Sequence, residues 1–170
     1  MKTKDVIADG YGRVQTAVHG VVDDLKPDHL TYRIDPEANT IAWLIWHLAR
    51  VQDDHVADVA RADQVWITDG WFERFGLPFD RKVIGYGMSR DEVGAVKIDD
   101  PQLLLDYVDA VTARTLDHVA GLTDDDLDRV VDTRWDPPVT LGVRLVSVIE
   151  DDLQHVGQAA YVKGVAQRMA

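Results

Sequence analysis

The chain of 170 residues contains no cysteine. Disulfide bonds, thiolate nucleophiles, zinc fingers and iron–sulfur clusters are therefore excluded. Long apolar runs are missing too, since none approaches the roughly 20 residues that a membrane-spanning helix needs. The first ten residues hold no long apolar stretch of the kind that marks a signal peptide. We therefore expect a cytoplasmic protein that does not act in a membrane.

Positive charge is scarce, with 18 basic against 30 acidic residues and a formal net charge of −12. Such a surface repels phosphate backbones and anionic membranes, so we expect no nucleic-acid partner. A hydrophobic fraction of 46% is ordinary for a globular protein. Length and composition together predict one domain over residues 1–170.

Four segments carry apolar residues at helical spacing, with polar, proline or glycine residues at their ends. They run from about Thr3 to Leu25, about Thr40 to Arg61, Pro101 to Gly121, and about Leu141 to Lys163. The second and third are separated by an aromatic-rich segment, 62–100, and an ordered loop of that length is usually functional. Residues 128–135 fit a short extended segment or hairpin arm, too little to build a sheet. We predict an all-α four-helix bundle with a long crossover between its second and third helices.

Three metal-ligating residue types stand on two of these helices. His47 interrupts the apolar stretch 40–49, while Asp151 and His155 lie four apart and so share one helical face. If the two helices face each other, three ligands of a divalent metal converge inside the bundle. Three protein ligands and an open coordination position are typical of a catalytic metal site, whereas a structural site usually has four protein ligands. Two imidazoles and one carboxylate suit Zn, Ni, Fe or Mn without selecting among them.

Each member of this trio also has a plainer interpretation. His47 alone fits a buried histidine that needs only a hydrogen-bond partner. Asp151 and His155 alone fit a surface pair of minor energetic weight. Their position between Val148 and Val156, in a helix whose pattern indicates that it is half-buried, favours a metal. A buried carboxylate beside a buried imidazole is costly unless a cation or hydrogen bonds offset it.

Other side chains qualify for the surroundings of this site. Asp54 lies only about 20° from His47 around the helix, which suits an orienting group or general base. An exposed carboxylate is the alternative. Gln158 continues the face of Asp151 and is a candidate to line the pocket. The candidate pocket walls, for which core packing is the alternative role, are Trp43, Trp71 and Tyr86.

Four stretches of the chain resemble the DinB-like (YfiT-like) metalloprotein superfamily, and in particular its DUF664 branch: 40–54, 74–79, 85–88 and 151–158. The resemblance implies an up-down-down-up four-helix bundle with one metal ligand on the second helix and two on the last. By position these are His47, Asp151 and His155. Many members have histidine in place of Asp151, whereas the related mycothiol-dependent maleylpyruvate isomerases carry an acidic residue there.

The resemblance also implies a chemistry, carried out on a small-molecule substrate. Characterised relatives are mycothiol- or bacillithiol-dependent isomerases and S-transferases, in which a metal lowers the pKa of the thiol. The composition, rich in Asp, Arg, Ala and Val, resembles that of proteins from GC-rich bacteria, and this favours mycothiol over bacillithiol. Relatives are often homodimers, so we expect a homodimer. Three alternatives stay open: a non-catalytic metal- or ligand-binding stress-response bundle, a metal-dependent hydrolase, and a metal-free structural protein.

Overall fold

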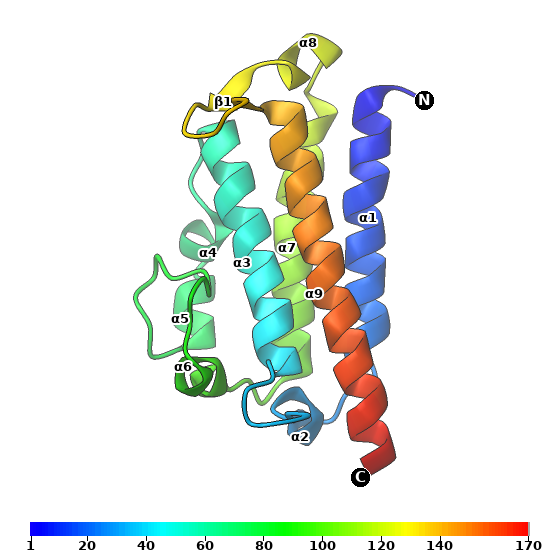
Figure 1. Cartoon of the computed structure of the whole chain (residues 1–170), viewed down its shortest axis with the longest axis vertical. Helices are drawn as coiled ribbons and strands as arrows, with labels where there is room; N and C mark the ends of the chain where they lie inside the picture. The colour runs from blue at the N-terminus through cyan, green and yellow to red at the C-terminus, as the bar shows by residue number, and fades with distance from the viewer. Residues whose placement is uncertain (170) are drawn as a thin grey trace.

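The computed structural model describes residues 1–169 and consists mainly of helices (Figure 1). Four helices are long: α1 (Thr3–Val22), α3 (Ile41–Ala60), α7 (Pro101–Ala120) and α9 (Leu141–Met169). The prediction of an all-α fold is confirmed. None of the helices described is both long enough and apolar enough to cross a bilayer.

The four long helices lie side by side. Helix α3 packs against α7 and α9, and α1 packs against the same two helices from the other side. In Figure 1 the chain descends along α1, ascends along α3 and α7, and descends again along α9. Helices α3 and α9, which carry the three candidate ligands, are therefore antiparallel neighbours.

Local signals explain where these helices begin. The Thr40 side chain accepts a hydrogen bond from the backbone N–H of Trp43 at 3.1 Å, which caps the first turn of α3. Asp100 caps α7 in the same way, ahead of proline at the first helical position.

Two predicted helix ends were wrong. Helix α1 ends at Val22 rather than near Leu25, because the chain must turn into α2 (Pro27–Leu30). Helix α9 continues through Gly164 to Met169, because Ala166 is still buried beyond the expected end. Tertiary burial here outweighs the helix-breaking tendency of one glycine.

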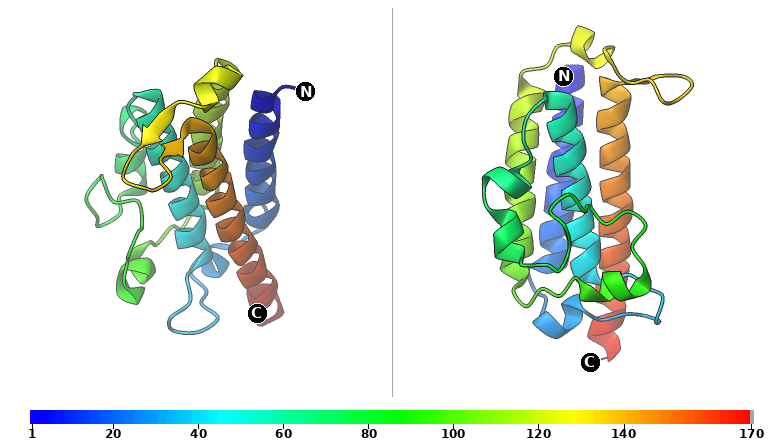
Figure 2. Two further views of the ribbon diagram at one scale, coloured as in Figure 1. Left: turned by 45° about the horizontal axis from the view of Figure 1, so that its top comes forward. Right: turned by 90° about the vertical axis from the view of Figure 1, so that its left-hand side faces the viewer.

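The crossover between α3 and α7 is not a plain loop. It holds α4 (Val65–Thr68), α5 (Trp71–Phe75) and α6 (Arg90–Ala95). In the right-hand view of Figure 2 this segment, drawn in green, lies across the outer faces of α3 and α7. Its aromatic side chains fill the space between, since Trp66 and Phe75 both pack on Tyr107 of α7. The crossover thereby covers the face of α3 that bears His47.

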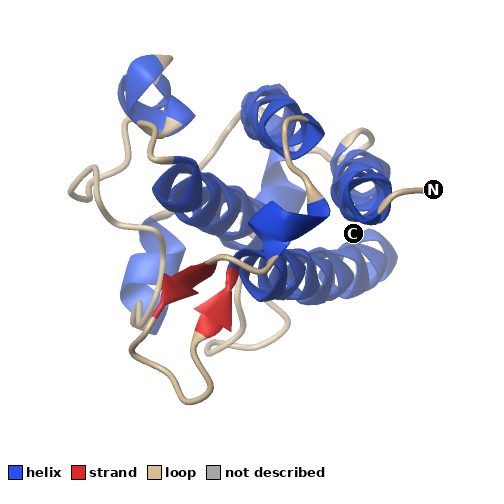
Figure 3. Ribbon diagram, turned by 90° about the horizontal axis from the view of Figure 1, so that it is seen from above, coloured by secondary structure: helices blue, strands red, loops and turns tan. Residues whose placement is uncertain are grey.

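The far end of the bundle is closed by α8 (Asp124–Leu127) and a small hairpin. Strands β1 (Val130–Asp132) and β2 (Val139–Thr140) pair antiparallel. Figure 3, which looks down on this end, shows the two strands beside the start of α9. The expected hairpin arm at residues 128–135 is therefore confirmed.

Candidate metal centre

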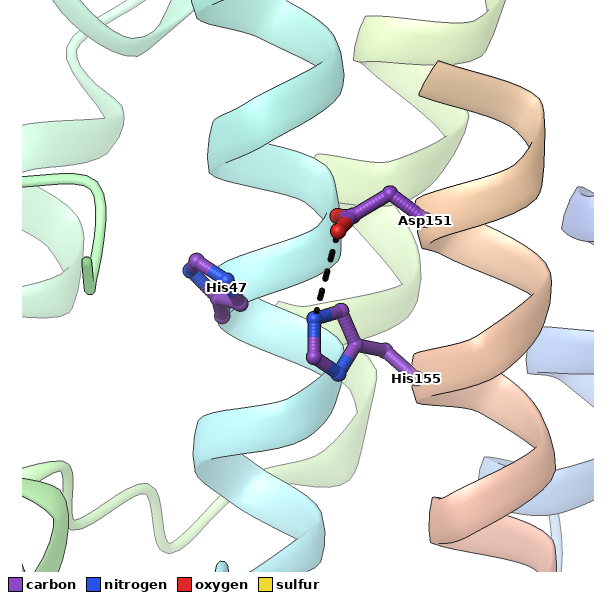
Figure 4. A group of neighbouring side chains, drawn as sticks. All are labelled: His47, Asp151 and His155. Carbon is purple, nitrogen blue, oxygen red and sulfur yellow. Dashed lines mark ion pairs between the residues drawn. The ribbon is translucent and has the colours of Figure 1, made fainter. Parts of the chain in front are cut away.

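The three candidate ligands meet between α3 and α9. One ligand atom from each of His47, Asp151 and His155 lies within 4.8 Å of the other two. Figure 4 shows Asp151 and His155 reaching from successive turns of α9 toward α3, where His47 stands. The imidazole centroids of His47 and His155 are 4.8 Å apart. Two ligands of one ion with bonds of about 2 Å lie at most about 4 Å apart, so the three side chains would have to move slightly closer to hold the same ion.

His47 is held in one orientation by the crossover. Its Nδ1 lies 2.5 Å from the backbone carbonyl oxygen of Ile84. A carbonyl only accepts, so Nδ1 carries the proton and Nε2 is left with its lone pair. Burial lowers the pKa of His47, which keeps the ring neutral at neutral pH. Metal-binding histidines commonly donate their second N–H to a carbonyl in this way.

Gly85 allows the crossover to approach the ring this closely. Its φ of +106° lies in a region that residues with a Cβ rarely adopt. A Cβ built on Gly85 would lie 2.4 Å from Nδ1 of His47. Both the backbone angle and the contact therefore require glycine at this position.

Asp151 and His155 form a loose pair on α9. Nε2 of His155 is 3.7 Å from Oδ1 of Asp151, and both side chains are mostly buried. Oδ2 of Asp151 and Nδ1 of His155 are buried without a hydrogen-bond partner among the described residues. Buried polar atoms are nearly always satisfied, so these orphaned atoms call for a ligand. A divalent cation bound between the two helices would meet that need, and the donor set fits one.

A cavity of about 280 Å³ opens onto the trio. Trp43 forms one wall, with its indole stacked 4.5 Å from the His47 ring and its Nε1–H donating to Sδ of Met88. Tyr86 stands at the mouth with 72% of its surface exposed. The structure thus brings two of the predicted pocket walls to the site.

Three other predicted site residues lie elsewhere. Trp71 is buried against Tyr107, outside the residues that line this cavity. Asp54 accepts a hydrogen bond from Gln64 at 2.7 Å and borders a different cavity. Gln158 is exposed and lines a third cavity next to the metal centre.

Arg50 was not predicted from the sequence as part of the site; it is fully buried one turn beyond His47. It donates to the carbonyl oxygens of Val83 and Arg81, at 3.4 Å each. These carbonyls lie one and three residues before Ile84, so Arg50 and His47 hold the same stretch of the crossover. A signal was present: an arginine in so apolar a helix must find acceptors inside the fold.

The fold and the site together indicate a class of protein: a helical bundle with a candidate metal site. Two histidines and a carboxylate form this site between two antiparallel helices. The chain belongs to the DinB superfamily, whose family model matches residues 11–159. All three candidate ligands lie within the matched range. Membership of the DUF664 branch and the relation to the maleylpyruvate isomerases stay predictions.

A solved structure shares the fold. It is the crystal structure of a conserved protein from Enterococcus faecalis, with 29% identity and a TM-score of 0.90. The similarity covers 96% of this chain and 96% of the other. No curated protein matches the chain.

Proposed function

We propose that the protein is a divalent-metal-dependent enzyme in which His47, Asp151 and His155 hold the ion. The main support for this proposal is that three ligand atoms lie within 4.8 Å of one another beside an open cavity. The reaction proposed is transfer of a low-molecular-weight thiol of the mycothiol type to a small electrophile, or a thiol-dependent isomerisation. The chain has no cysteine of its own, so the thiol comes from the cosubstrate.

The ion, when bound, supplies a lowered pKa for a coordinated thiol, so that thiolate is present at neutral pH. The protein's residues set up the charge around it. Two imidazoles and one carboxylate would together offset only one of the two charges of a divalent ion, which would leave the ion able to hold an anionic sulfur. In the transfer, the sulfur forms the new S–C bond, the leaving group departs with its electron pair, and the thiol proton passes to water.

Two aromatic residues shape the approach of the substrate. Trp43 shields the His47 side of the cavity from water, while exposed Tyr86 at the mouth is free to contact an incoming molecule. Asp54, which we considered as a general base, is hydrogen bonded through Gln64 to Arg50. We propose that Asp54 supports the crossover rather than contacts the substrate.

We also propose a cytoplasmic setting, where small thiols are kept reduced, and a homodimer. Several exposed apolar side chains on α9 could supply the dimer contact: Val143, Val146 and Leu153. Light scattering of the purified protein tests the oligomeric state.

The function is tested on protein purified without chelator and without nickel affinity resin. Elemental analysis should find about one divalent ion per chain, and the metal-loaded protein should consume thiol in the presence of a reactive haloarene. His155→Ala should lose metal and at least about 100-fold in rate, because it removes a direct ligand. The matched control is His19→Ala, which removes a histidine of α1 that faces Asp109 instead.

The alternatives give different results in the same experiment. One bound ion without thiol consumption would favour a non-catalytic binding module. Ester cleavage that needs metal but no thiol would favour a hydrolase. Protein that neither contains nor takes up metal would overturn the proposal in favour of a structural role.

A further inference from the structure

A second cavity adjoins the metal centre. It has a volume of about 450 Å³ and shares one wall residue, Asn39, with the cavity that opens onto the three ligands. Of the residues that the structure describes, none with a charged side chain lines it, although the chain as a whole is strongly acidic. The main apolar residues of this apolar groove are Ile34, Leu44, Tyr161 and Val162.

The apolar groove continues the metal site along the seam between α3 and α9. Leu44 precedes His47 by about one helical turn, and Val162 follows His155 by about two turns on the same face. Because α3 and α9 are antiparallel, these two displacements point toward the same end of the bundle (Figure 1). A molecule with one end at the ligands can therefore extend into the groove.

Gly157 of α9 is an exposed residue in the wall of the apolar groove. It lies inside α9, where glycine is less favourable than alanine for helix stability. A Cβ at this position would meet no atom within 4 Å, so packing does not require a glycine. The missing side chain leaves free space in the wall of the groove, and it lies about 200° around α9 from His155, so a side chain added there points away from the metal ligands.

We propose that the apolar groove binds the apolar body of the substrate while its reacting group lies at the metal centre. The substrate class is then a small electrophile with an uncharged alkyl or aromatic portion several carbons long. This inference rests on the proposed function. A second copy of the chain is the competing occupant, and the test below separates the two.

Two hydroxamates with the same metal-binding head test the groove: acetohydroxamate and octanohydroxamate. Their affinities for the zinc-loaded protein are measured by calorimetry. Each methylene group that leaves water contributes roughly fourfold in affinity. The longer probe should therefore bind the wild type at least about tenfold more tightly.

Gly157→Leu fills the groove without touching a ligand of the metal. It should abolish most of the advantage of octanohydroxamate and leave acetohydroxamate binding unchanged. The matched control is Gly20→Leu in α1, where an added Cβ also meets no atom within 4 Å. The control should keep the full advantage, and both variants should fold, since each replaces a helical glycine with a better helix former.

The outcomes separate the groove from the metal site. If acetohydroxamate binds and the longer probe gains nothing, the groove proposal fails and the metal site stands. If neither probe binds, the metal site fails and the groove proposal with it. If octanohydroxamate keeps its affinity advantage in Gly157→Leu, its alkyl chain binds outside the groove and the proposal is wrong. If the affinity advantage of octanohydroxamate is lost and Gly157→Leu also changes the molar mass in solution, the groove is a contact between subunits. That result also overturns the proposal.

Discussion

His47 has interactions on two sides of one ring. Nδ1 donates to the carbonyl oxygen of Ile84, and the rest of the ring faces His155 across the cavity. The first interaction leaves Nε2 unprotonated, so the crossover prepares the histidine for a metal before any ion arrives. The close approach that this requires is possible only because residue 85 is glycine.

Gly85→Ala should therefore weaken metal binding. The new Cβ would collide with Nδ1 of His47, and either the ring or the crossover must shift. We expect a loss of about 10–100-fold in zinc affinity, which is typical when a metal-binding histidine loses its orienting partner. Competition with a chromophoric chelator measures it.

The matched control is Gly87→Ala. Gly87 also has a positive φ, +70°, but a Cβ there would meet no atom within 4 Å. Both variants incur backbone strain, so both should lose some stability. Equal zinc affinities in the two variants would show that the contact with His47 does not matter.

Asp152, next to the ligand Asp151, is a buried carboxylate without a partner. It is fully buried, and neither oxygen is hydrogen bonded among the described residues. Burial, and to a lesser degree the charge of Asp151, raises the pKa of Asp152 well above its usual value. The folded chain therefore retains a proton that the unfolded chain loses.

Asp152→Asn should become more stable relative to the wild type as the pH rises. The pKa of Asp152 is higher in the folded chain than in the unfolded chain. The wild type therefore loses stability as the pH increases from about 4 toward the pKa of Asp152 in the folded chain. Asparagine does not titrate. We expect the difference in unfolding free energy to move by about 1–3 kcal/mol in favour of Asp152→Asn between pH 4.5 and 8.

Urea denaturation of the metal-free proteins at several pH values measures this change. Asp117→Asn, at an exposed position of α7, is the control and should show no comparable trend. A difference that is the same at pH 4.5 and pH 8 would contradict the assignment of a retained proton to Asp152.

At the scale of elements, the crossover is fastened to α3 from the inside. Besides the carbonyls of Val83 and Arg81, the Arg50 guanidinium donates to Gln64 at 2.9 Å and to the Tyr107 hydroxyl at 3.2 Å. One planar, fully buried group thus links the crossover with two long helices. The same stretch of crossover presents the Ile84 carbonyl to His47.

Arg50→Lys should release this fastening. A lysine ammonium cannot match the several acceptors arranged around the planar guanidinium. We expect a loss of about 2–4 kcal/mol in unfolding free energy, and weaker zinc binding because the Ile84 carbonyl is no longer held. Chemical denaturation and chelator competition measure the two effects.

Thr112→Val is the control for a general effect on the core. The Thr112 hydroxyl is buried and has no hydrogen-bond partner within residues 1–169, so its replacement should cost little and leave zinc affinity unchanged. If Arg50→Lys loses stability but retains full zinc affinity, Arg50 is structural only and does not position the site.

At the scale of the whole molecule, the metal centre would join α3 to α9, segments far apart in the sequence. An ion that binds only the folded chain stabilises it by mass action, by about 2.7 kcal/mol at 100 times its Kd. For a chain of this size we expect zinc to raise Tm by about 5–10 °C. Chelator should reverse the shift in a thermal denaturation assay.

Asp151→Asn supplies the matched comparison for this shift. It preserves the shape of the side chain and removes the only anionic ligand of the three, so the zinc-dependent rise in Tm should shrink clearly. An equal rise in the variant would place the ion at another site.

Local sequence signals predicted much of this structure. The spacing of apolar residues, the Thr40 cap and the Asp100-Pro101 pair located the four long helices, because these interactions involve residues only a few positions apart. The Asp151–His155 spacing predicted a shared face for the same reason. The ends of α1 and α9 were predicted less well, since a turn into α2 and burial against other helices decide them.

The amino-acid sequence by itself determined the helices, their apolar faces and the residue types able to bind a metal. Only the tertiary structure decided that His47 meets Asp151 and His155, that Ile84 orients the ring, and that Gln158 lies in a neighbouring groove. Helical periodicity is a property of neighbouring residues, whereas a site between antiparallel helices depends on which faces pack together. That choice is made by the burial of the whole core, including a crossover whose path no local pattern reveals.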